Sequence, residues 1–137
     1  MDWHNSDDTS ERIFSLTEAN ELIPTLQLHL TRVRQARRII EFTQRDIQRA
    51  SLQAEYGGGS QYGVLYLRAL EQISINLQAL EETGVLLKDV EAGLCDFPHR
   101  YDGRIVYLCW KLGEDEVAWW HESHSGFQGR QSITRLG

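Results

Sequence analysis

Residues 94–111, LCDFPHRYDGRIVYLCWK, contain two runs rich in apolar and aromatic side chains, separated by an Asp-Gly pair at positions 102 and 103. An Asp-Gly pair suits the two positive-φ positions of a type I′ turn, whose twist matches that of paired strands. We therefore predict a hairpin of two strands, residues 94–101 and 104–111. A two-residue turn sets the register, and it places Asp96 opposite Cys109.

The two faces of this hairpin carry different side chains, because residues directly opposite one another share a face of a sheet. The face that we expect to pack against helices carries Cys95, Phe97, His99, Val106, Leu108 and Trp110. The other face carries Leu94, Asp96, Pro98, Ile105, Tyr107 and Cys109. This second face is too apolar to be left in water. Its cover is either the C-terminal segment, residues 127–136, or a second subunit. The two cysteines lie on opposite faces, so no disulfide is expected.

Two further strands flank the hairpin, at residues 85–90 and 117–122, and no helical crossover separates any of the strands. The sheet, at about residues 85–122, is therefore predicted to be antiparallel with about four strands. Upstream, apolar residues recur at helical spacing in about residues 15–55 and in about residues 62–83. We predict an α+β fold in which a long antiparallel helical hairpin packs on a small antiparallel β-sheet.

The first helix carries a seam that repeats every seven residues and suits close packing against another helix. One row of the seam is Leu26, Val33, Ile40, Ile47 and Ala54, and the partner row is His29, Ala36, Thr43 and Ala50. Ser15 and Glu18 fit a capping box at the start of the helix. Pro24 either begins a second helical piece or kinks the first. Gly84 is the expected C-cap of the second helix, and residues 56–60 are a glycine-rich loop between the helices.

The chain of 137 residues is expected to form a single α+β domain, residues 13–137, after a flexible acidic tail, residues 1–12. Residues 123–137 form its C-terminal segment. No apolar run approaches the ~20 residues that cross a bilayer, and the first residues lack a signal-peptide pattern. Two cysteines are typical of buried thiols in a reducing compartment. These features predict a cytoplasmic protein that makes no membrane contact.

The net charge of −6 argues against nucleic acid as a partner, because such a partner favours a basic excess. Six arginines nevertheless fall in the first helix, namely Arg32, Arg34, Arg37, Arg38, Arg45 and Arg49. This row could bind RNA or an acidic partner, but the interleaved aromatic residues of a stacking platform are missing. We interpret the row as a solvated helix face.

The stretch His121-Glu122-Ser123-His124 lacks the spacing of the zinc-protease motif, in which i and i+4 histidines share a helical face. On a strand, His121 and His124 point to opposite sides, so we do not expect them to share a metal. His121 ends a strand and is expected to be structural, bonded to a carboxylate or a backbone carbonyl. His124 is expected to be exposed and tolerant of substitution.

A site assembled from several strands is an alternative. Groups that could hold a divalent transition metal lie in or beside the sheet: Asp89, Asp96, Cys109, Glu114 and His121. Asp96 and His121 are the expected ligands if a metal binds. The competing interpretation, which we favour, is that both aspartates cap turns and pair with a basic neighbour. These neighbours are Lys88, Arg100 and Arg104.

The length of the loop after the hairpin determines which residue of the second hairpin strand lies opposite His121. A loop of two or four residues places His121 opposite Leu108, whereas a loop of odd length brings it level with Cys109 or Tyr107, on the Asp96 face. A thiolate–imidazole pair is conceivable only in the odd case, and we expect Cys109 to be a buried, inert thiol. The glycine-spaced turn at residues 126–130 is expected to dock Phe127 into the core while Arg130 pairs with an acid.

Six motifs are distributed along the chain: FSLTEANELIP at residues 14–24, LKD at 87–89, GLCDFP at 93–98, LCWKLGE at 108–114, WH at 120–121 and GFQGR at 126–130. Together they resemble a prokaryotic family catalogued as domain of unknown function 2203, over roughly residues 14–130. The resemblance implies that Asp89, Asp96, Glu114, Trp120, His121 and Arg130 belong to whatever surface the family uses. It implies no activity.

The helix seam and the two-sided apolar sheet favour a binding or assembly module that acts as a homo-oligomer, in the simplest case a homodimer. Its candidate ligand-binding surface consists of Asp89, Asp96, Cys109, Glu114, Trp120, His121 and Arg130. The rival hypothesis is a small metal-dependent or hydrolytic enzyme with a site around Asp96 and His121. No motif in the chain names a reaction, a substrate or a cofactor.

Overall fold

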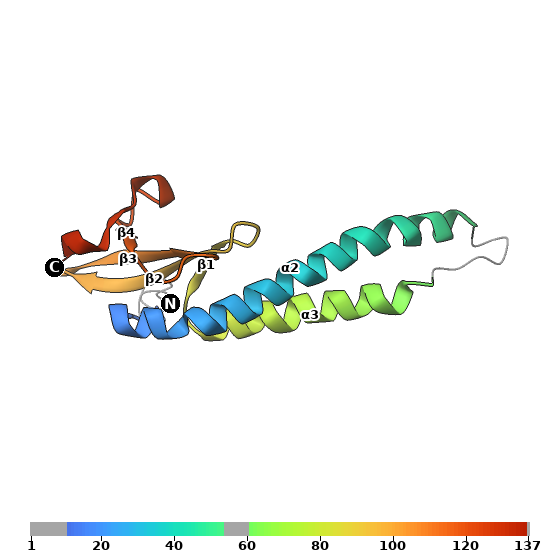
Figure 1. Cartoon of the computed structure of the whole chain (residues 1–137), viewed down its shortest axis with the longest axis horizontal. Helices are drawn as coiled ribbons and strands as arrows, with labels where there is room; N and C mark the ends of the chain where they lie inside the picture. Colours follow the sequence, from blue (N-terminus) through green and yellow to red (C-terminus); the bar gives the residue numbers. More distant parts are fainter. Residues whose placement is uncertain (1–10, 54–60, 137) are drawn as a thin grey trace, which may run out of the picture. The chain divides into compact units, whose positions relative to one another are not determined.

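The computed structural model describes residues 11–53 and 61–136 (Figure 1). Most of the predicted acidic tail, the glycine-rich loop and Ala54 lie outside the described residues, as does the side chain of Phe127. The helices are α2 (Leu16–Gln53) and α3 (Gly63–Glu82), followed by the strands β1 (Leu86–Asp89), β2 (Leu94–Tyr101), β3 (Arg104–Lys111), β4 (Trp119–His121) and β5 (Gln131–Ser132). Two short 3-10 turns, η2 (Phe127–Gly129) and η3 (Ile133–Leu136), flank β5. Neither described helix is long and apolar enough to span a membrane.

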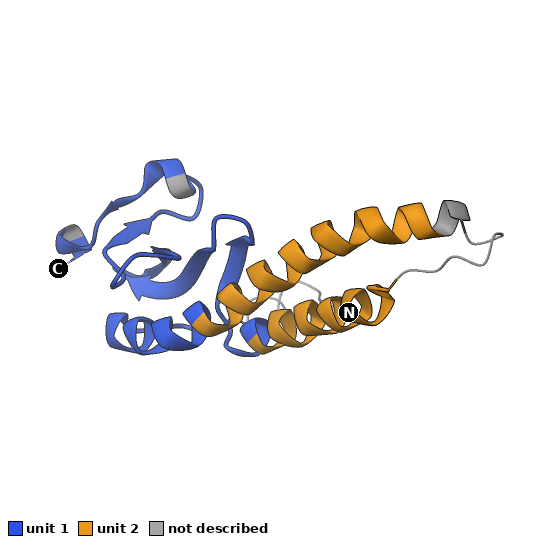
Figure 2. Cartoon of the chain, turned by 45° about the vertical axis from the view of Figure 1, so that its right-hand side comes forward, with its two compact units in different colours: residues 1–27, 80–137 blue, residues 28–79 orange. Residues whose placement is uncertain are grey.

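The chain divides into two compact units (Figure 2). We call residues 1–27 and 80–137 the sheet unit, because it holds all five strands together with the first turns of α2. Residues 28–79, most of α2 and α3, form the hairpin unit. The predicted combination of a long helical hairpin with a small antiparallel sheet, an α+β fold, is confirmed.

The sheet has five strands in the order β1-β2-β3-β4-β5, and every neighbouring pair is antiparallel. The prediction of about four strands missed β5, whose two residues pair with Trp119 and Trp120 of β4. A two-residue strand shows no alternation of polar and apolar side chains, so its sequence carries no strand signal. The β2–β3 register is the predicted one, with Asp96 opposite Cys109. Its turn has positive φ angles at Asp102 (51°) and Gly103 (74°), as a type I′ turn requires.

The start of α2 packs on the predicted core face of the sheet. The Phe14 ring meets the Phe97 ring edge to face, with centroids 5.4 Å apart. The backbone N–H of Phe14 donates to the Pro98 carbonyl, and Nδ1 of His99 lies 2.7 Å from the Phe14 carbonyl oxygen. The predicted capping box is present, because the Ser15 hydroxyl accepts from the backbone N–H of Glu18 and the Glu18 carboxylate accepts from that of Ser15. These contacts confirm the face that we assigned to the helices.

Helix α2 is more continuous around Pro24 than the sequence suggested. The residue lies inside α2, which runs unbroken through it, so Pro24 does not begin a separate helix. A hydrogen bond connects this part of α2 to the segment before β4: the Asn20 side-chain oxygen accepts from the backbone N–H of Val117. Gly84 has φ of 85°, as expected of a C-cap after α3.

The hairpin unit contains the predicted seam of α2 and a polar contact between the helices. Val33 and Thr43 are fully buried in the seam, whereas its outer members Ile40 and Ile47 are half-buried. Asn76 of α3 is also buried, and its side-chain oxygen lies 2.7 Å from Nδ1 of His29. Over the described residues, the seam is therefore buried at Leu26, Val33, Ala36 and Thr43 and only partly buried at its other positions.

Candidate functional site

The β3–β4 connection brings His121 to the Asp96 face of the sheet. It consists of residues 112–118, an odd number, and β4 pairs so that His121 is opposite Tyr107. This is one of the two outcomes that the sequence left open. Cys109 is opposite Trp119 instead, so His121 is level with Tyr107 and not with the thiol.

Asp96 and His121 form a buried pair. The Asp96 Oδ2 lies 2.9 Å from the His121 Nε2, and each side chain is 5% exposed. The other ring nitrogen, Nδ1, lies 2.7 Å from the backbone carbonyl oxygen of Glu122. His121 is therefore structural in the predicted sense, bonded to a carboxylate and to a backbone carbonyl at once.

The partners of His121 also limit where its protons lie. A carbonyl oxygen can only accept, so Nδ1 must carry a hydrogen. A second hydrogen lies between Nε2 and Oδ2 of Asp96, which makes the pair either an imidazolium with a carboxylate or an imidazole with a carboxylic acid. The pair has no net charge in either form. This neutrality explains how a carboxyl group is tolerated in the core, where an unpaired charge would be very costly.

Our favoured interpretation of the two aspartates holds only for the turn cap of Asp89, since no ion pair of Asp89 with a basic neighbour is seen within the described residues. Asp89 is exposed and its Oδ1 accepts from the backbone N–H of Ala92, 3.1 Å away, so it caps the turn after β1. Asp96 neither caps a turn nor pairs with a basic neighbour, and its partner is His121. Asp96 and His121 are 25 positions apart, so only the register of two separate strand pairings brings them together.

A cavity of about 280 Å³ opens beside this pair. It is lined by Lys88, Leu94, Asp96, Tyr107, His121, Ser123 and Gly126. The Tyr107 ring stacks on the His121 imidazole, with centroids 5.6 Å apart and planes 22° apart. Burial, and then the Glu11 carboxylate, raise the pKa of the Tyr107 hydroxyl. Lys88 and Tyr107 were not among the candidate residues; the predicted register already placed Tyr107 on the Asp96 face.

Glu114 and Arg130 form a second cluster on the same face. The Arg130 Nη2 lies 3.3 Å from both carboxylate oxygens of Glu114, so the predicted pairing of Arg130 with an acid is confirmed. The guanidinium carbon lies 4.9 Å from the centre of the Trp119 ring. The Glu114 carboxylate also accepts from the backbone N–H of Lys111. This cluster ties the C-terminal segment to the sheet, which supports that segment as part of the cover of the second face.

Cys109 is fully buried, and burial raises the pKa of its thiol to about 12 although the nearby Arg130 acts in the opposite direction. A group that holds its proton so firmly is a poor nucleophile at neutral pH. Cys95, on the opposite face, is buried in the same way, and its pKa is also raised to about 12. Both cysteines are free thiols. The prediction that Cys109 is buried is confirmed, and its raised pKa supports the expectation that the thiol is inert.

Trp120 lies on the face opposite the cavity. It pairs with Leu108, is 4% exposed, and its ring lies 5.8 Å from that of Tyr101. No hydrogen-bond partner for its buried indole nitrogen is present among the described residues. These contacts make Trp120 part of the core between the sheet and the start of α2.

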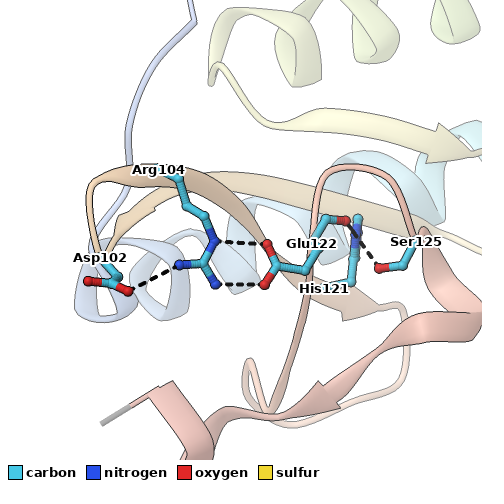
Figure 3. Close-up of polar contacts among 5 residues, drawn as sticks. All are labelled: Asp102, Arg104, His121, Glu122 and Ser125. Carbon is cyan, nitrogen blue, oxygen red and sulfur yellow. Dashed lines mark hydrogen bonds and ion pairs between the residues drawn. The ribbon is translucent and has the colours of Figure 1, made fainter.

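The segment after β4 is held by Glu122. Its carboxylate accepts two hydrogen bonds from Arg104, at 2.9 Å to Nε and 2.6 Å to Nη2 (Figure 3). Its backbone carbonyl accepts from the Ser125 hydroxyl as well as from His121. The Arg104 guanidinium lowers the pKa of the Glu122 carboxyl group. His124 is exposed, as predicted. Glu122 thus anchors the carbonyl group that orients the imidazole of His121.

Within the described ranges, residues 11–53 and 61–136, no three His, Cys, Asp or Glu side chains are grouped closely enough to hold a metal ion. Asp96 and His121 could supply only two ligands to a metal ion. Oδ2 of Asp96 and Nε2 of His121 already contact each other. The geometry therefore places a buried, neutral polar pair beside a small cavity.

The comparisons with known proteins identify a family. The family model described as "Uncharacterized conserved protein (DUF2203)" matches residues 12–133 of the chain. No curated protein and no solved structure matches the chain. The matched residues run from the capping box of α2 to strand β5, and they include both the Asp96–His121 pair and the cavity beside it. The chain belongs to the DUF2203 family of uncharacterised conserved proteins.

Proposed function

We propose that the protein is a binding module that receives a small polar ligand in the cavity beside the Asp96–His121 pair. One observation carries the proposal: the Asp96 carboxyl group, which meets His121 through Oδ2, lines the cavity together with Lys88. A carboxyl group and an ammonium group on the wall of one small cavity can orient a polar ligand that carries groups complementary to both.

The pair is better suited to binding than to acid–base catalysis. A histidine acts as a general base through an unprotonated ring nitrogen. In His121, one nitrogen donates to the Glu122 carbonyl and the other meets Asp96, so neither has a lone pair directed at a ligand. A nucleophile is also missing at Cys109, whose thiol keeps its proton at neutral pH. These features favour a binding module over the rival hypothesis of a hydrolytic enzyme.

The lining residues suggest the chemistry of the ligand. Asp96 Oδ1 accepts a hydrogen bond, so the ligand should carry an amine or a hydroxyl group. The Lys88 ammonium forms no ion pair within the described part of the chain, so the other end of the ligand should be an anion. A water-sized group occupies about 30 Å³, and 280 Å³ therefore fits a molecule of roughly ten non-hydrogen atoms. A small zwitterion meets these requirements.

A calorimetric titration of the full chain with small α- and β-amino acids tests the proposal, with carboxylates of equal size that lack the amine as matched compounds. We expect a zwitterion to bind and its amine-free counterpart to bind at least tenfold more weakly. Lys88→Met should abolish binding and leave the melting temperature unchanged, because Lys88 is exposed. Absence of binding by every zwitterion, or equal binding by the Lys88→Met variant, contradicts the proposal.

We also propose that the module assembles as a homodimer through the outer face of α3. Large apolar side chains on this helix are exposed, among them Val64 (64%), Leu67 (64%) and Ile75 (50%). Val64 and Leu67 are three positions apart and Ile75 is eight further on, a spacing that places them on one side of a helix. Exposed apolar clusters of this kind usually mark a contact surface, and two copies of one helix can cover each other by two-fold symmetry.

Sedimentation of the full chain at micromolar concentrations tests the dimer. We expect twice the mass of one chain, and Leu67→Glu should convert it to the monomer because the substitution places a charge in the contact. Gln44→Glu, exposed on α2 and so outside the apolar cluster of α3, serves as a control for added charge in the hairpin unit. A monomeric mass for the unsubstituted chain over the whole concentration range contradicts this part of the proposal.

A further inference from the structure

The outer surface of α2 carries a stripe of arginines with an aromatic residue among them. Arg38, Phe42, Arg45 and Arg49 follow one another at spacings of four, three and four, which places them on one side of the helix. The stripe spans about 16 Å along the helix axis, at 1.5 Å for each residue. The Phe42 side chain is 62% exposed, unusually much for a large apolar ring.

The structure adds a second aromatic residue to this stripe. The Tyr62 ring, from the segment just before α3, meets the Phe42 ring edge to face, with centroids 5.3 Å apart. Both rings line a cavity of about 610 Å³ together with all three arginines of the stripe. The interleaved aromatic residues of a stacking platform are therefore present. Phe42 was overlooked in the sequence, although its helical spacing among the arginines was visible, and the contact of Tyr62, which is 20 positions away, could not have been found there.

The guanidinium groups of the stripe are available to an anion. No hydrogen bond or ion pair joins Arg38, Arg45 or Arg49 to another side chain within the described ranges. Glu41 and Asp46 also line the cavity, so the local positive excess is small. The wider surroundings are basic nevertheless, because residues 28–79 contain seven arginines and four acidic residues. Charges beyond about 8–10 Å are screened at physiological ionic strength, so an anion at this surface meets mainly the charged residues that line the cavity, three basic and two acidic.

We propose that this stripe, which we call the arginine–aromatic surface, binds single-stranded nucleic acid. The arginines contact phosphates, and a base stacks on the exposed face of Phe42. Three arginines spread over about 16 Å can contact two to three phosphates of one strand. An acidic peptide would satisfy the arginines as well, but it has no planar group for the ring. This binding is separate from the proposed ligand cavity, which lies in the sheet unit.

Fluorescence anisotropy of the full chain with labelled 12-mers of uridine and of thymidine tests the inference, each titrated at several salt concentrations. We expect micromolar affinity at 50 mM salt. The logarithm of the association constant should fall with the logarithm of the salt concentration with a slope of about −2, since each phosphate contact contributes about −0.7 on a single strand. Tighter binding of the uridine 12-mer would identify the ligand as RNA, and tighter binding of the thymidine 12-mer would identify it as DNA.

Three variants separate stacking from charge. Phe42→Ala should weaken binding at least about fivefold, because a stacked base contributes at least that much when its aromatic partner is removed. Arg45→Gln should reduce the salt slope by about 0.7. Arg32→Gln, on the same helix but lining a different cavity, should leave both quantities unchanged. Circular dichroism of each variant checks that the helices persist.

The proposal fails if neither 12-mer binds at 50 mM salt. It also fails if Phe42→Ala binds as tightly as the unsubstituted chain, or if a glutamate 12-mer competes as effectively as the oligonucleotides. Either of the last two results would leave a surface that attracts anions through charge alone. Failure here leaves the zwitterion site untouched, because the two experiments use different ligands and different residues.

Discussion

The sheet unit and the hairpin unit distribute their apolar side chains in opposite ways. Of the eighteen buried hydrophobic residues among the described residues, only four belong to residues 28–79. Of the eight exposed large hydrophobic residues, seven do. Charge is divided as unevenly, since residues 28–79 hold seven of the fourteen basic residues but only four of the twenty acidic ones.

The number of packed layers of secondary structure in each unit explains this difference. In the sheet unit, a five-stranded sheet has the start of α2 on one face and the Glu114–Arg130 cluster on the other. Cover on both faces shields most of the sheet from water, so the sheet unit can enclose a polar pair such as Asp96 and His121. Two helices alone form a single shared seam and leave their outer sides in water. The sheet unit is therefore suited to a buried site and the hairpin unit to contacts on its surface.

The largest effect that we expect from a single substitution is in the sheet unit. His121→Ala leaves Asp96 buried without its partner and should lower the free energy of unfolding by about 3–5 kcal/mol, the range for a broken buried pair. Urea denaturation of the full chain measures the loss. His124→Ala is the control and should change it by no more than about 0.5 kcal/mol, since His124 is exposed. Equal losses from the two substitutions would show that the buried pair does not distinguish the sheet unit.

The second effect concerns the thiols, which both belong to the sheet unit. With pKa values raised to about 12 by burial, Cys95 and Cys109 should react on the order of a thousandfold more slowly with a disulfide reagent at pH 8 than in the unfolded chain. The raised pKa also stabilises the fold below the pKa of an unfolded thiol, about 8.5. This contribution should be lost as the pH rises from there towards 12. Rapid modification of either thiol in the native protein would reveal an opening of the sheet unit.

A smaller effect is expected in the hairpin unit. Asn76→Ala removes the side chain that contacts His29 and donates to the Gln72 carbonyl, 2.7 Å away. We expect a loss of about 1–3 kcal/mol in the free energy of unfolding, because a buried polar partner is left unsatisfied. Ser74→Ala, exposed on the same helix, is the matched control. A loss that appears as a separate early transition would show that the hairpin unit unfolds independently.

The smallest effect is expected at the exposed ion pair of the sheet unit. Arg104 lowers the pKa of the Glu122 carboxyl group below its unfolded value of 4.5. The stability from this pair is therefore present above pH 4.5 and lost as the pH falls through the lowered pKa. Arg104→Gln should lower the urea midpoint slightly at pH 7 and not at all at the acid end of the range. Arg100→Gln is the control. A difference that persists in acid would mean that Arg104 stabilises the strand by packing.

Local sequence signals predicted the hairpin and the helix ends well. The Asp-Gly pair at positions 102 and 103 predicted both the turn and the register, because few other turns connect two adjacent strands that closely. The seven-residue seam and the capping box at Ser15 likewise depend on neighbours within a few positions. Strand β5 was missed, because two residues cannot show a pattern.

The candidate site was predicted only as a set of residues. Asp96 and His121 were both named, but the sequence left His121 on either face of the sheet, and it suggested a turn cap or a surface ion pair for Asp96. Lys88 and Tyr107, which line the cavity, were not named as site residues. The Phe42–Tyr62 contact was missed for the same reason, since nothing in the local pattern joins two helices.

The sequence by itself determined the α+β class, the hairpin register and the faces on which its side chains lie, because turn chemistry and side-chain periodicity act over a few residues. Only the tertiary structure decided that His121 meets Asp96, that a cavity opens beside them, and that Tyr62 joins Phe42 among the arginines. Each of these contacts joins residues 20 or more positions apart. Their formation depends on loop lengths and on packing between elements, which no local pattern specifies.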